Sequence, residues 1–208
     1  MDILKKIDGT YEREIIGEMD LIYREIEAEQ NLWREKCGFD CAAGCGQCCV
    51  GFEPDILDSE ALFLASWILE NQEEKAMSIL DGSFVPKRSG EYKGCILFDE
   101  SSPYHCTVYG GRCCICRLFG YSGDRGKDGK KRFKPCKFYP ENTPLVFERR
   151  QYEENELFSK FAALPPAFSD TMEKVIAISP EHTETKPLRQ ALLEAIKRLL
   201  FLSQFGGQ

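Results

Sequence analysis

The sequence predicts a mainly α-helical fold in which a helical frame surrounds an irregular, loop-rich core held by a cysteine-ligated metal. Two observations lead to this prediction. Stretches near both ends of the chain repeat apolar residues at helical spacing, whereas residues 83–149 are rich in Gly, Pro and Cys and lack sustained periodicity. The 208 residues can bury a real core, so residues 1–208 are predicted to form a single domain.

The N-terminal part of the chain predicts two helices. In residues 10–36, Ile15, Met19, Ile22 and Ile26 recur on one face, and this helix leads directly into the cysteine-rich region 37–140. A second helix is predicted over residues 58–80. Asp58 would be its N-cap, and Asp81-Gly82 would end it.

The C-terminal part, residues 150–205, predicts three further helices. They cover residues 151–164, ended by Pro165-Pro166, then residues 169–178, then residues 187–205. Pro187 suits the first turn of the last helix, and Gly206-Gly207 would lie past its end. The apolar face of that helix predicts packing against the core rather than a membrane anchor.

Composition predicts a cytoplasmic protein with reduced thiols. No apolar run approaches the ~20 residues that span a bilayer, and the charged N-terminus does not resemble a signal peptide. The cytoplasm keeps thiols reduced, and the eleven cysteines are an odd number. Metal ligation is therefore favoured over a disulfide framework.

Charge is distributed unevenly along the chain. The net charge is −7, yet residues 105–140 carry nine Lys and Arg against two Asp, a local net of +7. The Gly-rich segment 123–137 predicts an irregular basic loop, which is either a solvated surface or a docking patch for an acidic protein or a redox partner. The acidic remainder and the few aromatic residues of the loop disfavour nucleic-acid binding.

The cysteines fall into closely spaced groups. Thiolates are soft ligands that favour zinc, copper(I) or iron–sulfur clusters, and short spacings let sulfurs of one loop converge on one centre. Cys41, Cys45 and Cys48 also match the C-x3-C-x2-C spacing of radical SAM enzymes, and Cys45–Cys48 match a redox C-x-x-C. Neither alternative is favoured, because the alternation of strands and helices that those folds need is missing.

The complete pattern resembles the YkgJ-type cysteine-cluster family, a zinc- or iron-chelating domain often described as an iron–sulfur protein. C-x3-C-x2-C-C is followed by an acidic residue ahead of a helix, by a Gly-Cys segment, and by C-x2-Y-x2-R-x3-C-R. This chain departs from the pattern at Cys113, where the family commonly has Pro after the Arg. The matching positions, within residues 37–140, are Cys41, Cys45, Cys48, Cys49, Cys95, Cys106, Tyr109, Arg112, Cys116 and Arg117, with Cys136 as a further cysteine.

The resemblance implies eight metal ligands. They are Cys41, Cys45, Cys48, Cys49, Cys95, Cys106, Cys116 and Cys136. Eight thiolates suit two four-ligand sites or one multinuclear cluster, and the adjacent Cys48 and Cys49 side chains are expected to diverge toward different metals. Cys37, Cys113 and Cys114 are left over and are expected to be small buried hydrophobes. Arg112 and Arg117 are expected to stabilise the charge on the sulfurs without ligating metal.

An iron–sulfur cluster with a redox or electron-transfer role is the favoured function, because the ligands outnumber those of one small structural site. Three alternatives stay open. They are a zinc-stabilised interaction module without catalysis, a metal-handling protein, and a methyl-transfer role, since flagellin lysine methylases share the cysteine motif. The chain lacks the motifs of ordinary hydrolases and nucleotide-binding proteins, so whether it is an enzyme is left open.

Overall fold

A computed structural model describes residues 1–208 except 42–43, 87–93, 139–147, 149 and 206–208. The described chain is mainly α-helical, as predicted. Its helices are α1 (Ile3–Lys6), α2 (Tyr11–Cys37), α3 (Gln47–Val50), α4 (Asp58–Asn71), α5 (Glu73–Leu80), α6 (Cys114–Leu118), α7 (Glu154–Phe161), α8 (Phe168–Ile178) and α9 (Leu188–Leu202), with a 3-10 turn η1 (Tyr109–Gly111).

Two small antiparallel sheets accompany the helices. The first pairs β1 (Asp55–Ile56) with β5 (Lys186–Pro187). The second has the order β2-β3-β4, formed by β2 (Asp124–Arg125), β3 (Lys131–Phe133) and β4 (Tyr152–Glu153). The first sheet brings the start of α9 beside the start of α4, where the Leu188 N–H donates to the Pro54 carbonyl at 2.9 Å.

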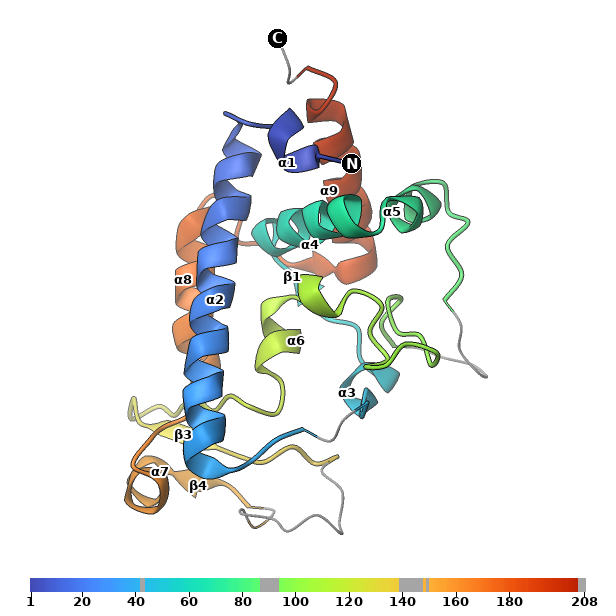
Figure 1. The fold of residues 1–208 in the computed structure, drawn as a ribbon. Coiled ribbons are helices and arrows are strands. Elements are labelled where there is room, and N and C mark those ends of the chain that lie inside the picture. The colour runs from blue at the N-terminus through green and yellow to red at the C-terminus, as the bar shows by residue number, and fades with distance from the viewer. Residues whose placement is uncertain (42–43, 87–93, 139–147, 149, 206–208) are drawn as a thin grey trace.

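The larger apolar core surrounds α4, which packs against α2 and α9. Most side chains of α4 are buried, including Leu62, Leu64 and Ile68, so this helix forms the centre of the core. In Figure 1, α1, α4, α5 and α9 lie at one end of the molecule, and α6 lies between them and the β3–β4 sheet.

The long helix α2 connects the two ends of the molecule (Figure 1). Its N-cap is Thr10, whose hydroxyl accepts from the Arg13 N–H, and it ends at Gly38 in the left-handed conformation. The prediction of a helix over 10–36 is confirmed within one residue. Near its C-terminal end, Trp33 and Cys37 belong to a second, smaller apolar cluster.

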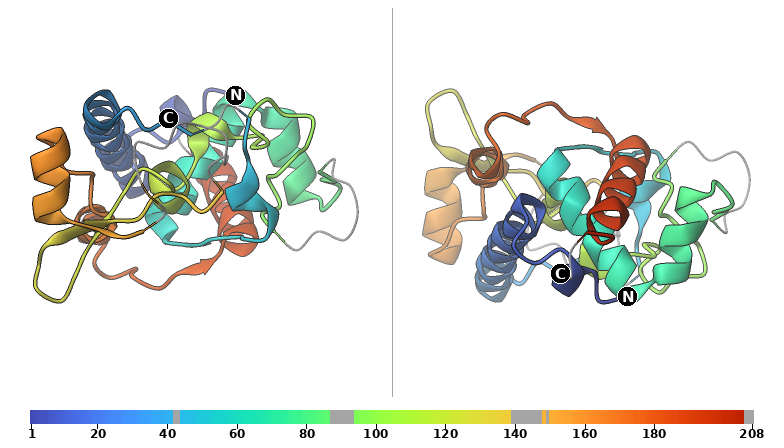
Figure 2. Two further views of the ribbon diagram at one scale, coloured as in Figure 1. Left: turned by 90° about the horizontal axis from the view of Figure 1, so that it is seen from below. Right: turned by 90° about the horizontal axis from the view of Figure 1, so that it is seen from above.

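This second cluster joins α2 to the three-stranded sheet and to α7. Aromatic rings meet edge to face, with the Trp33 ring centroid 5.6 Å from that of Phe133 and 5.5 Å from that of Phe161. Phe39 packs on Phe133 at 6.1 Å. Both views in Figure 2 place α7 and the β2–β3 hairpin at the opposite end of the molecule from α5.

The predicted helix 58–80 is two helices. The backbone breaks at Gln72, whose side-chain amide donates to the Thr107 carbonyl at 2.7 Å, and α5 then leaves in a new direction. The prediction that Asp58 is the N-cap was also wrong. Leu57 occupies that position, Glu60 accepts from its N–H at 3.0 Å, and Asp58 instead binds Arg198 at 2.8 Å. The helix end at Asp81-Gly82 is confirmed.

The three C-terminal helices are confirmed, with shifted boundaries. Residues 152–153 form β4 rather than helix, because they pair with Arg132 and Phe133 of β3. Helix α7 ends at Ala162 in the left-handed conformation, before Pro165-Pro166. Pro187 is the N-cap of α9 rather than a residue of its first turn, and Gly206-Gly207 lie outside the described residues.

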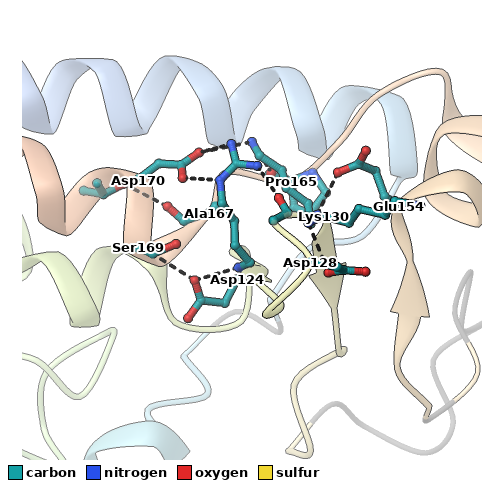
Figure 3. Close-up of polar contacts among 12 residues, drawn as sticks. Asp124, Asp128, Lys130, Glu154, Pro165, Ala167, Ser169 and Asp170 are labelled. Atoms are coloured by element: carbon teal, nitrogen blue, oxygen red, sulfur yellow. Dashed lines mark hydrogen bonds and ion pairs between the residues drawn. The ribbon is translucent and has the colours of Figure 1, made fainter.

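The prediction of an irregular loop over 123–137 was wrong for residues 124–133, which form the β2–β3 hairpin, whereas residues 134–137 lie in no helix or strand. Carboxylates from distant parts of the chain hold the hairpin, as Figure 3 shows. Asp170 of α8 binds Arg125 at 2.8 Å and lies 3.8 Å from the Lys131 ammonium, and the Lys131 N–H donates to Glu154 at 2.7 Å. These contacts neutralise part of the basic charge of the segment.

Of the helices that the structure describes, none combines the length and the apolarity that crossing a bilayer requires.

Candidate metal centre

All eight predicted cysteine ligands line one cavity of about 480 Å³. The walls come from the chain after α2, from α3, from the loop before η1, from α6 and from the segment after β3. A ninth thiol, that of Cys113, also lines the cavity. Segments separated by almost a hundred residues therefore bring their thiols together, as the family resemblance implied.

A tight turn before α3 positions the first cysteine cluster. Gly46 is in the left-handed conformation with φ of 56°, and a Cβ placed there would lie 2.5 Å from the His105 ring. Only glycine allows this backbone conformation and this close approach without strain. The turn thus places Cys45, Cys48 and Cys49 next to the loop that contains Cys106.

Cys48 and Cys49 point to the same place, contrary to the expectation that they diverge. Their sulfurs are 3.8 Å apart. The hydrogen bond between the two thiols lowers the pKa of Cys48 to about 7, and the positive charge of Arg112 acts in the same direction. The same hydrogen bond raises the pKa of Cys49.

Backbone contacts place Cys95 and Cys106 beside α3. The Cys95 N–H donates to the Cys49 carbonyl at 3.4 Å, and Cys106 forms an antiparallel bridge with Phe98. The Thr107 N–H donates to the Leu97 carbonyl at 3.0 Å and closes this loop. Cys95 is 7% exposed, so this wall of the cavity adjoins the apolar core.

Cys41 is held by a polar network at the end of α2. Its N–H donates to the Tyr121 hydroxyl at 2.9 Å, and that hydroxyl donates to Asp40 at 2.6 Å. Asp40 is also paired with Arg34, which packs over the Tyr121 ring. Burial is the largest cause that raises the pKa of Tyr121, and the bond to Asp40 adds to it, so the hydroxyl stays protonated and keeps donating.

Arg112 and Arg117 take different positions behind the thiols. Arg112 lies over the Tyr109 ring at 3.5 Å and donates to the Cys116 carbonyl at 3.3 Å, and its charge favours the thiolates of Cys48, Cys106 and Cys116. Arg117 turns away toward the Tyr23 ring at 4.1 Å and donates to the Arg112 carbonyl at 2.7 Å. Of the two guanidinium groups, that of Arg112 thus acts on the cavity thiolates, and Arg117 fixes the backbone of Arg112.

The three cysteines outside the predicted ligand set are all buried. Cys37 packs in the second apolar cluster, and burial raises its pKa. The Cys114 N–H donates to the buried Glu60 carboxylate at 2.8 Å, and burial raises the pKa of the Cys114 thiol as well. Cys113 is 1% exposed and borders the cavity, so it lies nearer to the predicted ligands than the other two.

The donor chemistry of the cavity fits a soft metal. Burial raises the pKa of most of these thiols, so they need a cation to ionise, and a thiophilic metal supplies one. Among the described residues, no three His, Cys, Asp or Glu side chains are already gathered into a finished metal site.

Sequence reasoning missed the residues that shape the cavity without donating a thiol. Tyr121, Asp40 and Gly46 carry no recognisable motif, and their partners lie far away in the chain. Gly110 was also missed, although it stands inside the Cys106–Cys116 motif. A Cβ on Gly110 would lie 2.9 Å from the Trp67 ring of α4. The position of the turn η1 therefore depends on residue 110 having no side chain.

The fold and the cavity define a mainly α-helical protein with a cysteine-lined cavity. A family model, CxxCxxCC, described as "Putative zinc- or iron-chelating domain", matches residues 40–159, more than half of the chain. The chain therefore belongs to this family of metal-chelating domains. Comparisons with curated proteins and with solved structures find no match.

Proposed function

We propose that the cavity holds iron in iron–sulfur form and that the protein transfers electrons. The observation that carries this proposal is a single cavity of about 480 Å³ lined by nine cysteines. A structural zinc ion takes four thiolates in a closed tetrahedron and needs neither the additional thiols nor the space. Iron–sulfur clusters bring inorganic sulfide with the iron and occupy more room.

The position of the cavity supports exchange of electrons with a partner. Cys41 is exposed, and so are the neighbouring aromatic rings of Tyr104 and Tyr109. These residues line the cavity together with the buried Cys95, so the cavity reaches from the apolar core to the surface. A redox centre there would lie within reach of a docked protein.

The charge around the cavity also supports this proposal. Thiolates and sulfide concentrate negative charge, and nearby cations and hydrogen-bond donors raise the reduction potential of such a centre. Arg112 lies beside the thiols and supplies a cation, and its guanidinium is held by the Tyr109 and Cys116 carbonyls. Replacing it would be expected to lower the potential.

Anaerobic purification followed by analysis of iron, acid-labile sulfide and zinc tests the proposal. The expected protein is brown, contains iron and sulfide in similar amounts, and loses its visible absorption on reduction with dithionite. A colourless protein that contains zinc and no sulfide would contradict the redox function.

Zinc is the second candidate, and one observation favours it. The cysteine segments lie between the two apolar clusters, so a structural ion there would tie one end of the molecule to the other. In that case the protein would be an interaction module or would handle metal without transferring electrons. The same elemental analysis separates the two candidates.

For the partner, we propose an acidic redox protein that docks on the basic segment 123–137, in a reducing compartment such as the cytoplasm. The exposed Lys127, Lys130, Lys134 and Lys137 support this docking surface, whereas Arg125, Lys131 and Arg132 are already ion-paired within the chain. Association with such a partner would weaken steeply as salt is added.

A further inference from the structure

We propose that Tyr23 and Gln30 of α2 are positioning residues for metal binding and that they act through Arg117. None of these three side chains is assigned to the metal itself. Their role is to hold the segment that carries Cys106 and Cys116 in place before the metal arrives. This role rests on the proposed function only in that the cavity thiols bind a metal, and it is the same for iron and for zinc.

Two arginines close the segment between Cys106 and Cys116 onto itself. Arg112, directly after η1, donates forward to the Cys116 carbonyl at 3.3 Å. Arg117, in α6, donates backward to the Arg112 carbonyl at 2.7 Å and also to the Gly110 carbonyl. These three hydrogen bonds, called the arginine clasp from here on, fix the turn η1 relative to α6. Their donors are charged, which makes them stronger than bonds between neutral groups.

Helix α2 holds the arginine clasp at two points. The Arg117 guanidinium lies over the face of the Tyr23 ring, 4.1 Å from its centroid, and the Gln30 side-chain amide donates to the Arg117 carbonyl at 2.7 Å. Tyr23 and Gln30 are seven residues apart, which is about two turns, so they share one face of α2. One helix therefore binds Arg117 at its side chain and at its backbone.

Tyr23 is a rigid support because the core surrounds it. It is 3% exposed, and its ring meets that of Phe63 of α4 edge to face, with 4.6 Å between centroids. The guanidinium of Arg117 thus packs on a ring that is itself held between α2 and α4. A cation over an aromatic face gains more attraction when both groups are shielded from water.

The segment also rests directly on α4. A Cβ on Gly110 or Gly111 would lie 2.9 Å or 3.0 Å from the Trp67 ring, and the Cys114 N–H donates to Glu60 at 2.8 Å. Helices α2 and α4 belong to the larger apolar core. The core rather than the metal therefore sets the position of the turn η1 and of the start of α6.

A segment that is fixed in advance changes how tightly metal binds. Ligands that are ordered only on binding cost conformational entropy at that step, and ligands held near the required geometry avoid part of that cost. Lysine at position 117 would keep the positive charge, but its single ammonium cannot donate as a planar fork to two carbonyls while it stacks on a ring. The shape of the arginine, and not its charge alone, is needed for the clasp.

The test is the affinity of the metal-stripped full chain for Co²⁺, measured by competition with a chelator of known affinity. The variants are Arg117→Lys, Tyr23→Leu and Gln30→Leu. Each is expected to bind Co²⁺ about tenfold more weakly than the wild type, the effect of losing one such contact. Thiolate-bound cobalt absorbs strongly, and its ligand-field bands depend on the geometry around the metal, so these bands should also change.

Two controls separate positioning from general stability. Tyr23→Phe keeps the ring and should bind Co²⁺ as the wild type does. Met19→Ala removes a side chain that is 0% exposed, one turn before Tyr23 on α2, and that is not among the described residues lining the cavity. It should lower the free energy of unfolding and leave the cobalt affinity and the ligand-field bands unchanged. If Tyr23→Leu does not fold, Gln30→Leu and Arg117→Lys still decide the outcome.

Wild-type affinity in Arg117→Lys and Gln30→Leu would overturn the positioning role. Equal weakening by Met19→Ala and Tyr23→Leu would overturn it as well, because loss of core packing alone would then explain the effect. Weakening by Tyr23→Phe would contradict the contact between the guanidinium and the ring. A wild-type chain that binds no cobalt would instead overturn metal binding itself, so the two failures are distinguishable.

Discussion

At the scale of single residues, Glu60 is a buried carboxylate that connects the core helix α4 to the cysteine segment. One oxygen accepts from the Leu57 N–H at 3.0 Å and the other from the Cys114 N–H at 2.8 Å. The first bond caps α4, and the second fixes the start of α6. A single side chain thus sets the position of Cys116 relative to the core.

We expect Glu60→Gln to lower the free energy of unfolding by about 1–3 kcal/mol, because an amide has one acceptor oxygen and leaves one buried N–H without a partner. Glu70→Gln is the matched control. The Ile3 and Leu4 N–H groups both bind one oxygen of Glu70, so an amide can keep both bonds. Equal destabilisation of the two variants in urea unfolding would contradict this role of Glu60.

The wild type and Glu60→Gln should also differ in how the free energy of unfolding depends on pH. Burial raises the pKa of Glu60 above its ordinary value of 4.5, so the folded chain holds this proton more tightly than the unfolded chain. The wild type therefore loses stability as the pH rises from 4.5 through the raised pKa, and Glu60→Gln lacks this loss. The stability difference between them should be largest in acid and should shrink as the pH rises.

At the scale of elements, the turn η1 and the helix α4 fit together because Gly110 has no side chain. We expect Gly110→Ala to destabilise the protein by about 1–3 kcal/mol through overpacking against Trp67. Gly51→Ala is the control, since a Cβ there meets nothing within 4 Å. If thermal unfolding shows the two variants to be equally stable, the close approach of Gly110 to α4 does not matter.

The β2–β3 hairpin depends on α8 through Asp170. Asp170→Asn removes the charge that pairs with Arg125 and Lys131, and the partly exposed position limits the expected loss to about 1 kcal/mol. Asp20→Asn breaks an exposed pair with Arg24 within α2 and serves as the control. Added salt should reduce the effect of Asp170→Asn, and a loss that is insensitive to salt would contradict an ionic origin.

Elements with their own periodicity could be predicted from the sequence, and elements made by distant partners could not. The apolar stripe of α2 and its Thr10 and Gly38 ends are local, so the helix was predicted within one residue. The break at Gln72 depends on the Thr107 carbonyl, and the hairpin depends on Asp170 and Glu154. No local sequence pattern indicates those contacts.

The candidate site also has features that the sequence could predict and features that it could not. The motif spacing and the family resemblance indicated the eight thiols that the structure brings to one cavity. They did not indicate the convergence of Cys48 and Cys49, the border position of Cys113 or the network of Tyr121 and Asp40, because these follow from the path of the backbone. The ligand roles themselves stay predictions until metal content is measured.

At the scale of the whole molecule, metal should matter more for one part of the fold than for another. Helices α4 and α9 bury apolar side chains against each other along their whole length, whereas the segments that carry the cavity thiols add isolated buried residues such as Leu97, Val108 and Leu118. Removing metal should therefore lower hydrogen-exchange protection in residues 44–50, 94–118 and 134–138, which carry most of the cavity thiols, and leave that of α4 and α9 nearly unchanged. Equal protection in the cysteine segments before and after stripping would contradict this coupling.

The two tryptophans of the chain lie in different halves of the structure, and this makes them natural optical reporters. Trp33 is buried in the aromatic cluster against which Cys136 packs, and Trp67 lies against Gly110, between Cys106 and Cys116 in the chain. Trp33→Phe and Trp67→Phe would each leave one emitter. Stopped-flow fluorescence of the two variants during chelation would then time the response of each half separately.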